Sequence, residues 1–359
     1  MRRTGKKAAA LAVTAALAVS AAGCGSVKDS DVVVTIGGEK VTVGVANFFA
    51  RYQQAEYETY YSGVMGEDMW STEISKGKSY EETVKNQILE TLENMYVLED
   101  HMGDYKVEIT EEEKKKISEA AKAFDEANGL EEKEAVSGTT ENVERMLTLV
   151  TIQEKMQKAM VADVDTEVSD EEAAQKSMQY VNLSLTKTKE DGSTEQMTEE
   201  EKAEAKKKAE AFQKAVKEGA DFAKTAKEKE LEVKTMTFDE ETTTPDEGLM
   251  TKANKLGEGE VSEVIETDSG YYVLKVTSLL DREATDAEKE SIAEERKEKQ
   301  YKDLCEEWKK DVKIEVNEKV WDKISFEKKG IKMKQQEEMQ KVYAKYGSSP
   351  TGGCLPTLI

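Results

Sequence analysis

The sequence is poor in histidine, cysteine and proline, with one His, three Cys and three Pro among 359 residues. A single His excludes metal sites built from several imidazoles and argues against a Ser-His-Asp triad. Three Cys exclude a disulfide scaffold. Basic charge is also short, because 52 Lys and Arg face 75 Asp and Glu, for a net charge of -23. This acidity argues against a nucleic-acid binder, and neither a cofactor nor a metal is expected.

The first two dozen residues have the composition of an export signal. A basic start precedes an apolar run over 8–22, whose 15 residues are too few to span a bilayer. Small residues then lead into Cys24, and this arrangement resembles a bacterial lipoprotein signal. We therefore expect residues 1–23 to be a signal peptide and Cys24 to carry the lipid. The protein would be exported and lipid-anchored to the outer face of the bacterial cytoplasmic membrane.

Hydrophobic periodicity predicts a mostly helical region over 24–165. Two β-branched runs joined by Gly37-Gly38 predict a hairpin over 32–43. Ser79 and Thr110, each followed three residues later by Glu, predict helix starts, and apolar spacing over 143–152 predicts a further helix. An aromatic stretch belongs either to the core or to a partly exposed surface for unfolded clients. Its members are Phe48, Phe49, Tyr52, Tyr57, Tyr60 and Tyr61.

A compact α+β module is expected over 166–284. Its predicted order is a capping box at 169–172, a strand at 180–185, a polar loop at 187–196, a long helix from Thr198, a short helix from Asp221, and strands at 231–238 and 271–277. Helix returns after Thr285, which gives a C-terminal arm over 285–327. A tail over 328–359 follows, with six Lys and two Glu between 328 and 346.

Three segments of this module resemble parvulin-type peptidyl-prolyl isomerases. Residues 219–228 read GADFAKTAKE and match the family's G-x-D-F-x-x-x-A helix. Residues 256–263 read LGEGEVSE, similar to its L-x-x-G-E-V-S turn, and residues 268–276 read DSGYYVLKV, similar to its closing strand. The start of the hairpin, IGGEKVT at 36–42, resembles the corresponding segment of PrsA- and SurA-like folding factors.

The resemblance implies an α+β fold in which mostly helical N- and C-terminal chaperone arms flank an inserted parvulin-like module. It implies a folding factor for unfolded or newly secreted polypeptides, acting by prolyl isomerisation, by chaperone holding, or by both. Two alternatives remain: a catalytically inactive parvulin-fold chaperone and a peptide-binding lipoprotein. A solute-binding lipoprotein is disfavoured because alternating strand–helix lobes are absent. The expected partners are such polypeptides and the membrane, reached through the lipid on Cys24.

The family's site residues map onto altered positions of this chain. Asn182 and Tyr272 stand where the family has its two His, Leu249 stands at the pocket Phe, and Thr235 stands roughly at an Asp or Cys. The resemblance implies a substrate groove lined by Leu249, Tyr272 and Phe238. Whether these positions catalyse isomerisation or are ordinary domain residues stays open at this point.

Two further residues have structural interpretations. His101 lies at the end of a predicted helix, where a surface or C-cap role is expected. Cys305 lies on an apolar helical face and is expected in the core, with a disulfide to Cys354 as an alternative in an exported protein.

Overall fold

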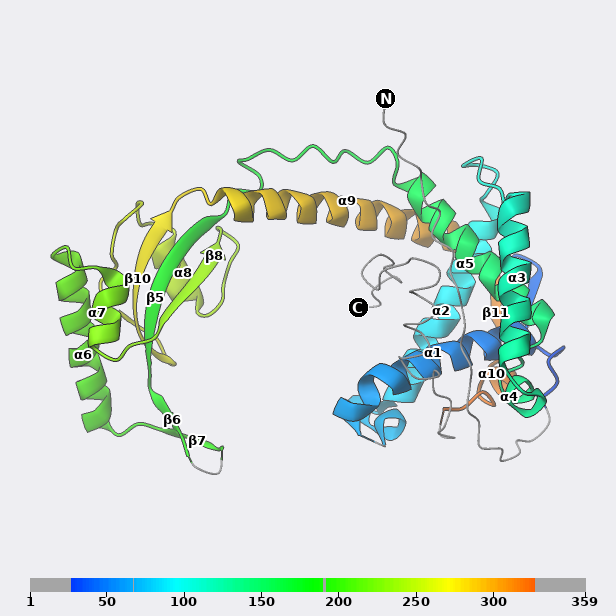
Figure 1. The fold of residues 1–359 in the computed structure, drawn as a ribbon, viewed down its shortest axis with the longest axis horizontal. Coiled ribbons are helices and arrows are strands. Elements are labelled where there is room, and N and C mark those ends of the chain that lie inside the picture. The colour runs from blue at the N-terminus through cyan, green and yellow to red at the C-terminus, as the bar shows by residue number, and fades with distance from the viewer. Residues whose placement is uncertain (1–26, 67, 190–191, 327–359) are drawn as a thin grey trace. The chain divides into compact units, whose positions relative to one another are not determined.

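We analysed a computed structural model of the chain, which describes residues 27–66, 68–189 and 192–326. The chain divides into two compact units (Figure 1). Unit 1 combines residues 1–163 with 299–359, and unit 2 comprises residues 164–298. The predictions for residues 1–23, Cys24, Cys354 and the tail over 328–359 concern positions outside the described residues. Within the described ranges, no helix is both long enough and apolar enough to cross a membrane.

A small sheet joins the two ends of unit 1. The predicted hairpin is confirmed as β1 (Val32–Ile36) and β2 (Glu39–Thr42), which pair antiparallel. Gly37 and Gly38 turn the chain with φ values of +59° and +103°, a region that favours glycine. On its other side, β1 pairs antiparallel with β11 (Ile314–Val316), so that Val34 lies opposite Val316. The C-terminal arm is therefore part of the same sheet as the N-terminal hairpin.

Helices make up the rest of unit 1 in its described part. They are α1 (Val43–Met65), η1 (Met69–Ser71), α2 (Tyr80–Asp100), α3 (Glu111–Ala127), α4 (Leu130–Ala135), α5 (Thr140–Met160), the end of α9 (Arg282–Asp311) and α10 (Glu318–Trp321), with a short β3 (Glu73–Ser75)–β4 (Lys78–Ser79) hairpin. The predicted helix starts are confirmed: the Ser79 side chain accepts from the Glu82 N–H, and Thr110 and Glu113 form a reciprocal capping box.

The core of unit 1 is built around α1, α2, α3 and α5. Phe48 and Phe49 on α1 are buried, and the Phe48 ring packs edge-on against Phe124 at 5.3 Å between centroids. The core prediction for the aromatic stretch is therefore confirmed in its first half. Tyr60 and Tyr61 near the end of α1 are exposed instead, so the stretch changes its environment along the helix.

His101 and Cys305 both lie at a second apolar cluster of unit 1. His101 is the C-cap of α2, as expected; its ring stacks on Trp308 at 4.1 Å, and its Nδ1 lies 2.8 Å from an Asp104 carboxylate oxygen. Cys305 is buried and forms no disulfide within the described residues, which do not include Cys354. Burial raises the pKa of its thiol to about 11, so it is protonated at neutral pH. The core role of Cys305 is confirmed.

Unit 2 is a four-stranded antiparallel sheet with helices on both faces. The strand order is β8 (Val233–Phe238), β5 (Lys176–Ser184), β10 (Gly270–Ser278) and β9 (Ile265–Glu266). Figure 1 shows α6 (Glu199–Lys217) and α7 (Phe222–Glu228) beside one face and α8 (Glu247–Ala253) beside the other. Thr198 and Asp221 cap α6 and α7, as predicted. The α+β class is confirmed.

Several local predictions for unit 2 need correction. Residues 169–172 form a single turn rather than a helix start, because the sheet begins soon afterwards at Lys176. The loop expected over 187–196 is a hairpin of β6 (Thr186–Thr188) and β7 (Thr194–Gln196), whose largely polar side chains carry no hydrophobic alternation. Helix α8 and strand β9 were not predicted, since seven and two residues are too short to show a period.

Candidate functional site

Four of the sequence-predicted site residues lie on one face of the unit 2 sheet. Asn182 on β5 lies directly opposite Tyr272 on β10. Phe238 ends β8, and Leu249 on α8 packs against the same apolar cluster as Phe238 and Tyr272. Thr235 is not part of this group, because it is exposed and pairs with Gln179. The neighbouring pair Met236 and Met178 belongs to the apolar cluster, and side chains one position along a strand point to the opposite face.

A hydrogen-bonded pair replaces the two histidines expected from the family. The Asn182 Nδ2 donates to the Tyr272 hydroxyl at 3.1 Å, and the Ser269 hydroxyl lies 3.1 Å from the same oxygen. The Asn182 Oδ1 is buried without a hydrogen-bond partner among the described residues. A Cβ at Gly270 would collide with this oxygen and lie 2.7 Å from the Leu183 carbonyl. Glycine is therefore required at 270 for β10 to pass so close to Asn182.

Helix α8 is fixed over this face by polar contacts at both of its ends. The Asp246 side chain caps it by accepting from the Leu249 N–H at 2.8 Å. At the other end, the Asn254 Nδ2 donates to the Asp239 carbonyl at 2.8 Å. Burial would raise the pKa of Asp239, but hydrogen bonds from Thr242 and Gln175 hold it below its ordinary value. Leu249 is therefore held against the sheet from both sides of its helix.

The apolar members of this group are buried. Leu249 and Phe238 are 0 % exposed, and Tyr272 is 3 % exposed. Their surroundings are those of a packed core, and the remaining polar groups are an amide and hydroxyls rather than an imidazole. Through Asn182, Tyr272 and Ser269 the face can donate and accept hydrogen bonds.

A second candidate site lies on unit 1, at the exposed end of α1. We call Tyr60, Tyr61 and Val64 the α1 patch; they are 58 %, 50 % and 88 % exposed. Tyr57 lies beneath it, with its ring 5.7 Å from Tyr61 and 6.0 Å from Trp70. Val64 was not predicted from the sequence as a member of the aromatic stretch. It lies four residues after Tyr60 and three after Tyr61, the spacing of one helix face.

The α1 patch rests on a base of aromatic rings. Burial raises the pKa of Tyr57, with smaller contributions from Tyr61 and Glu56. Burial likewise raises the pKa of Tyr80 to about 12, and the Tyr80 ring stacks on Trp70 at 5.5 Å. These rings form a fixed support beneath the exposed side chains. Over the described residues, no group of three His, Cys, Asp or Glu is placed to hold a metal ion.

Comparison with known proteins gives matches to the module and to most of the chain. Residues 180–290 match the PPIC-type PPIase domain family. The foldase protein PrsA of Clostridium botulinum is 28 % identical over 320 residues, which cover 81 % of this chain and 90 % of that protein.

Solved structures also align, at low similarity. The PrsA foldase of Lactococcus lactis is 16 % identical, with a TM-score of 0.30 over 88 % of this chain and 99 % of its own. A structure described among the SurA-like chaperones of Campylobacter jejuni is 12 % identical, with a TM-score of 0.28 over 79 % of this chain and 98 % of its own.

Proposed function

For a chain that belongs to the PrsA-like, parvulin-domain proteins, we propose the function of an extracytoplasmic foldase that holds unfolded segments of secreted polypeptides. The α1 patch carries this proposal. Monomeric proteins rarely expose large apolar side chains side by side, and such groups mark interaction sites. Here Tyr60, Tyr61 and Val64 lie at the end of α1, and the packed rings of Tyr57, Trp70 and Tyr80 support them. The chain as a whole has a net charge of -23. An unfolded segment would bury its apolar side chains there.

We also propose that the protein is exported and anchored to the membrane by a lipid. The leader composition of residues 1–23, with small residues before Cys24, supports export and a lipid on Cys24. A lipid anchor would keep the holding surface at the membrane where secreted chains emerge. Metabolic labelling with a fatty-acid analogue, compared between the natural chain and Cys24→Ser, tests the anchor directly.

The holding function predicts a loss of aggregation suppression when the α1 patch is made polar. Tyr60→Ser/Tyr61→Ser/Val64→Ser removes apolar contact area worth roughly 1.5–3 kcal/mol for each buried side chain, so we expect at least fivefold more protein to be needed. The measurement is light scattering of a chemically unfolded client diluted into buffer. Leu130→Ser/Leu279→Ser, at side chains 71 % and 43 % exposed elsewhere, is the matched control. Equal suppression by the patch variant and the natural chain would exclude the patch as the holding surface.

Prolyl isomerisation is the second candidate function, favoured by the PPIC-type match over 180–290. Because Leu249 and Phe238 are buried, we expect the chain to lower the ~18–20 kcal/mol rotation barrier of short X-Pro peptides by less than about 1.4 kcal/mol, or under tenfold in rate. The assay follows cis-to-trans conversion without a coupling protease. A larger acceleration that Tyr272→Phe removes would instead assign isomerisation to the Asn182–Tyr272 pair.

A further inference from the structure

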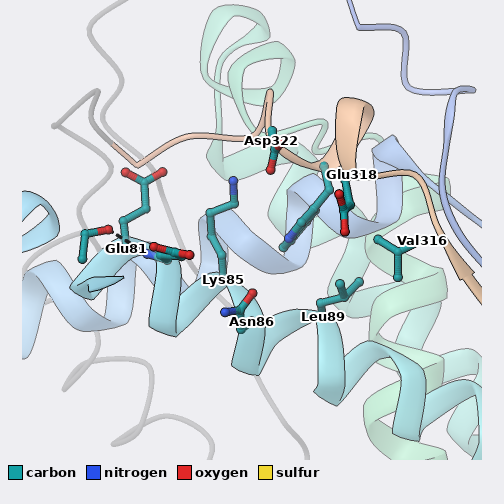
Figure 2. A pocket seen from close by; sticks show the side chains of 10 residues that line it. Glu81, Lys85, Asn86, Leu89, Val316, Glu318 and Asp322 are labelled. Carbon is teal, nitrogen blue, oxygen red and sulfur yellow. Dashed lines mark hydrogen bonds between the residues drawn. The ribbon is translucent and has the colours of Figure 1, made fainter. Parts of the chain in front are cut away.

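An acidic pocket lies in unit 1 between the start of α2 and the segment from β11 to α10. It has a volume of about 390 Å³ and is lined by Ser79, Glu81, Glu82, Lys85, Asn86, Leu89, Val316, Glu318, Trp321 and Asp322. Figure 2 shows the α2 side chains facing those of Val316, Glu318 and Asp322 across the opening. Four of the lining residues are acidic and one is basic. The pocket therefore favours a cationic ligand.

Three apolar residues, Leu89, Val316 and Trp321, also line the pocket. Trp321 is 4 % exposed, Leu89 is half-buried, and Val316 is exposed at the edge strand of its sheet. Acidic groups beside apolar side chains suit a Lys or Arg side chain, whose aliphatic stem packs on apolar surface while its charged end reaches carboxylates.

The Trp321 indole supplies an independent indication of a ligand. Its Nε1 is buried without a hydrogen-bond partner among the described residues, and an unsatisfied buried donor costs about 1–3 kcal/mol. The Lys85 ammonium lies 5.4 Å from the centre of the ring. Burial lowers the pKa of Lys85, although Glu81 and Asp322 oppose the shift, so this ammonium gains little from its position. The indole N–H lies in the plane of the ring and the ammonium lies over its face, so Lys85 does not satisfy this donor, which stays open to an acceptor such as a peptide carbonyl.

We infer that this pocket binds an extended polypeptide segment carrying Lys or Arg beside an apolar residue. The inference rests on the proposed function and names the client chemistry that it favours. The basic side chain would lie among Glu82, Glu318 and Asp322, its apolar neighbour would contact Leu89 and Val316, and a backbone carbonyl of the client would accept from the Trp321 Nε1. The α1 patch and this pocket would then recognise different features of an unfolded chain.

The rival occupant is the chain's own basic tail. The Phe326 N–H donates to a carboxylate oxygen of the lining residue Glu81 at 2.7 Å. Lys328, the first residue of the tail, follows Phe326 by two positions in the sequence. A tethered segment has a high effective concentration and would exclude clients if it bound there. The experiment therefore includes a chain ending at residue 326.

The test measures fluorescence anisotropy of two labelled, unstructured peptides that differ only in Lys and Arg replaced by Gln. We expect the natural chain, without residues 1–23, to bind the basic peptide at least tenfold more tightly than the neutral one, with a preference that falls as salt rises. Glu82→Gln/Glu318→Gln/Asp322→Asn should abolish the preference. Glu90→Gln/Glu119→Gln/Glu126→Gln, with the same charge change at exposed positions outside the pocket, should retain it. Trp321→Phe should weaken binding of both peptides about fivefold, because it removes one hydrogen bond.

Three results would overturn the inference. The first is equal affinity for the two peptides. The second is an equal loss of preference in both triple variants, which would reflect net charge rather than the pocket. The third is a basic preference seen only in the chain ending at 326, which would assign the pocket to the tail. Aggregation suppression of an uncharged apolar client, measured on the same samples, reports on the α1 patch; its loss with a retained basic preference would reject the holding proposal and leave the pocket in place.

Discussion

Replacing Phe238 with alanine is expected to lower the free energy of unfolding of unit 2 by about 3–5 kcal/mol, the usual cost of deleting a fully buried phenyl ring. Phe238 is 0 % exposed and packs with Met178, Leu249 and Tyr272 in the cluster beneath α8. The loss combines transfer of the ring into water with the cavity left behind, since α8 is held at both ends and cannot collapse freely onto the sheet.

Hydrogen exchange of β5 and β10 is the measurement of choice for this variant. The three Trp of the chain, at 70, 308 and 321, all belong to unit 1, so tryptophan fluorescence does not report on unit 2. Leu279→Ala, at a side chain 43 % exposed, should cost less than about 0.5 kcal/mol and serves as the control. If Phe238→Ala leaves exchange unchanged but weakens peptide binding, Phe238 lines an open groove and the packed-core interpretation is wrong.

Replacing Glu58 with alanine is expected to destabilise unit 1 by about 3 kcal/mol. Glu58 is 5 % exposed, and one of its carboxylate oxygens accepts from the Gln54 Nε2 at 2.7 Å and from the Trp70 Nε1 at 2.9 Å. Both donors come from buried side chains, and a buried donor left without its acceptor costs about 1–3 kcal/mol. Removing the carboxylate leaves the Trp70 indole N–H buried without its acceptor.

The same network holds the last described residues against α1. Arg51 donates to the Ser325 carbonyl at 2.7 Å, and Gln54 donates to the Phe326 carbonyl at 3.4 Å. Denaturant unfolding followed by Trp fluorescence measures the loss. Glu58→Gln, which keeps an acceptor oxygen, should cost about 1 kcal/mol, and Glu56→Ala on the same helix should cost less than Glu58→Ala. Equal costs for Glu58→Ala and Glu58→Gln would show that the carboxylate is not the acceptor on which the two donors depend.

Local signals in the sequence predicted the elements that are determined locally. The capping residues Thr110, Thr198 and Asp221 each mark a helix start found in the structure, because a cap satisfies donors within three residues of itself. The strand at 180–185 was predicted from its apolar alternation, and the predicted strand at 271–277 is also present, as part of β10. The β6–β7 hairpin was not predicted, since its side chains are largely polar and show no hydrophobic alternation.

The arrangement of the candidate sites depends on contacts that sequence spacing cannot give. The resemblance placed Asn182 and Tyr272 at equivalent family positions, and the sheet register brings them into hydrogen-bond contact. The same register puts Thr235, which the resemblance placed only roughly, on the opposite face. The acidic pocket was missed because Lys85 and Trp321 are more than 200 positions apart in the sequence.

The pairing of β1 with β11 sets an order of events for a chain made from its N-terminus. Unit 2 is continuous, so it can fold as soon as residue 298 has emerged. The sheet of unit 1 instead closes a loop of about 280 residues between Val34 and Val316, and it cannot form before the C-terminal arm arrives. Until then, the apolar faces of α1, α2 and α5 lack part of their cover. The chain therefore keeps apolar surface uncovered until its C-terminal arm arrives, and unit 1 is the last part to mature.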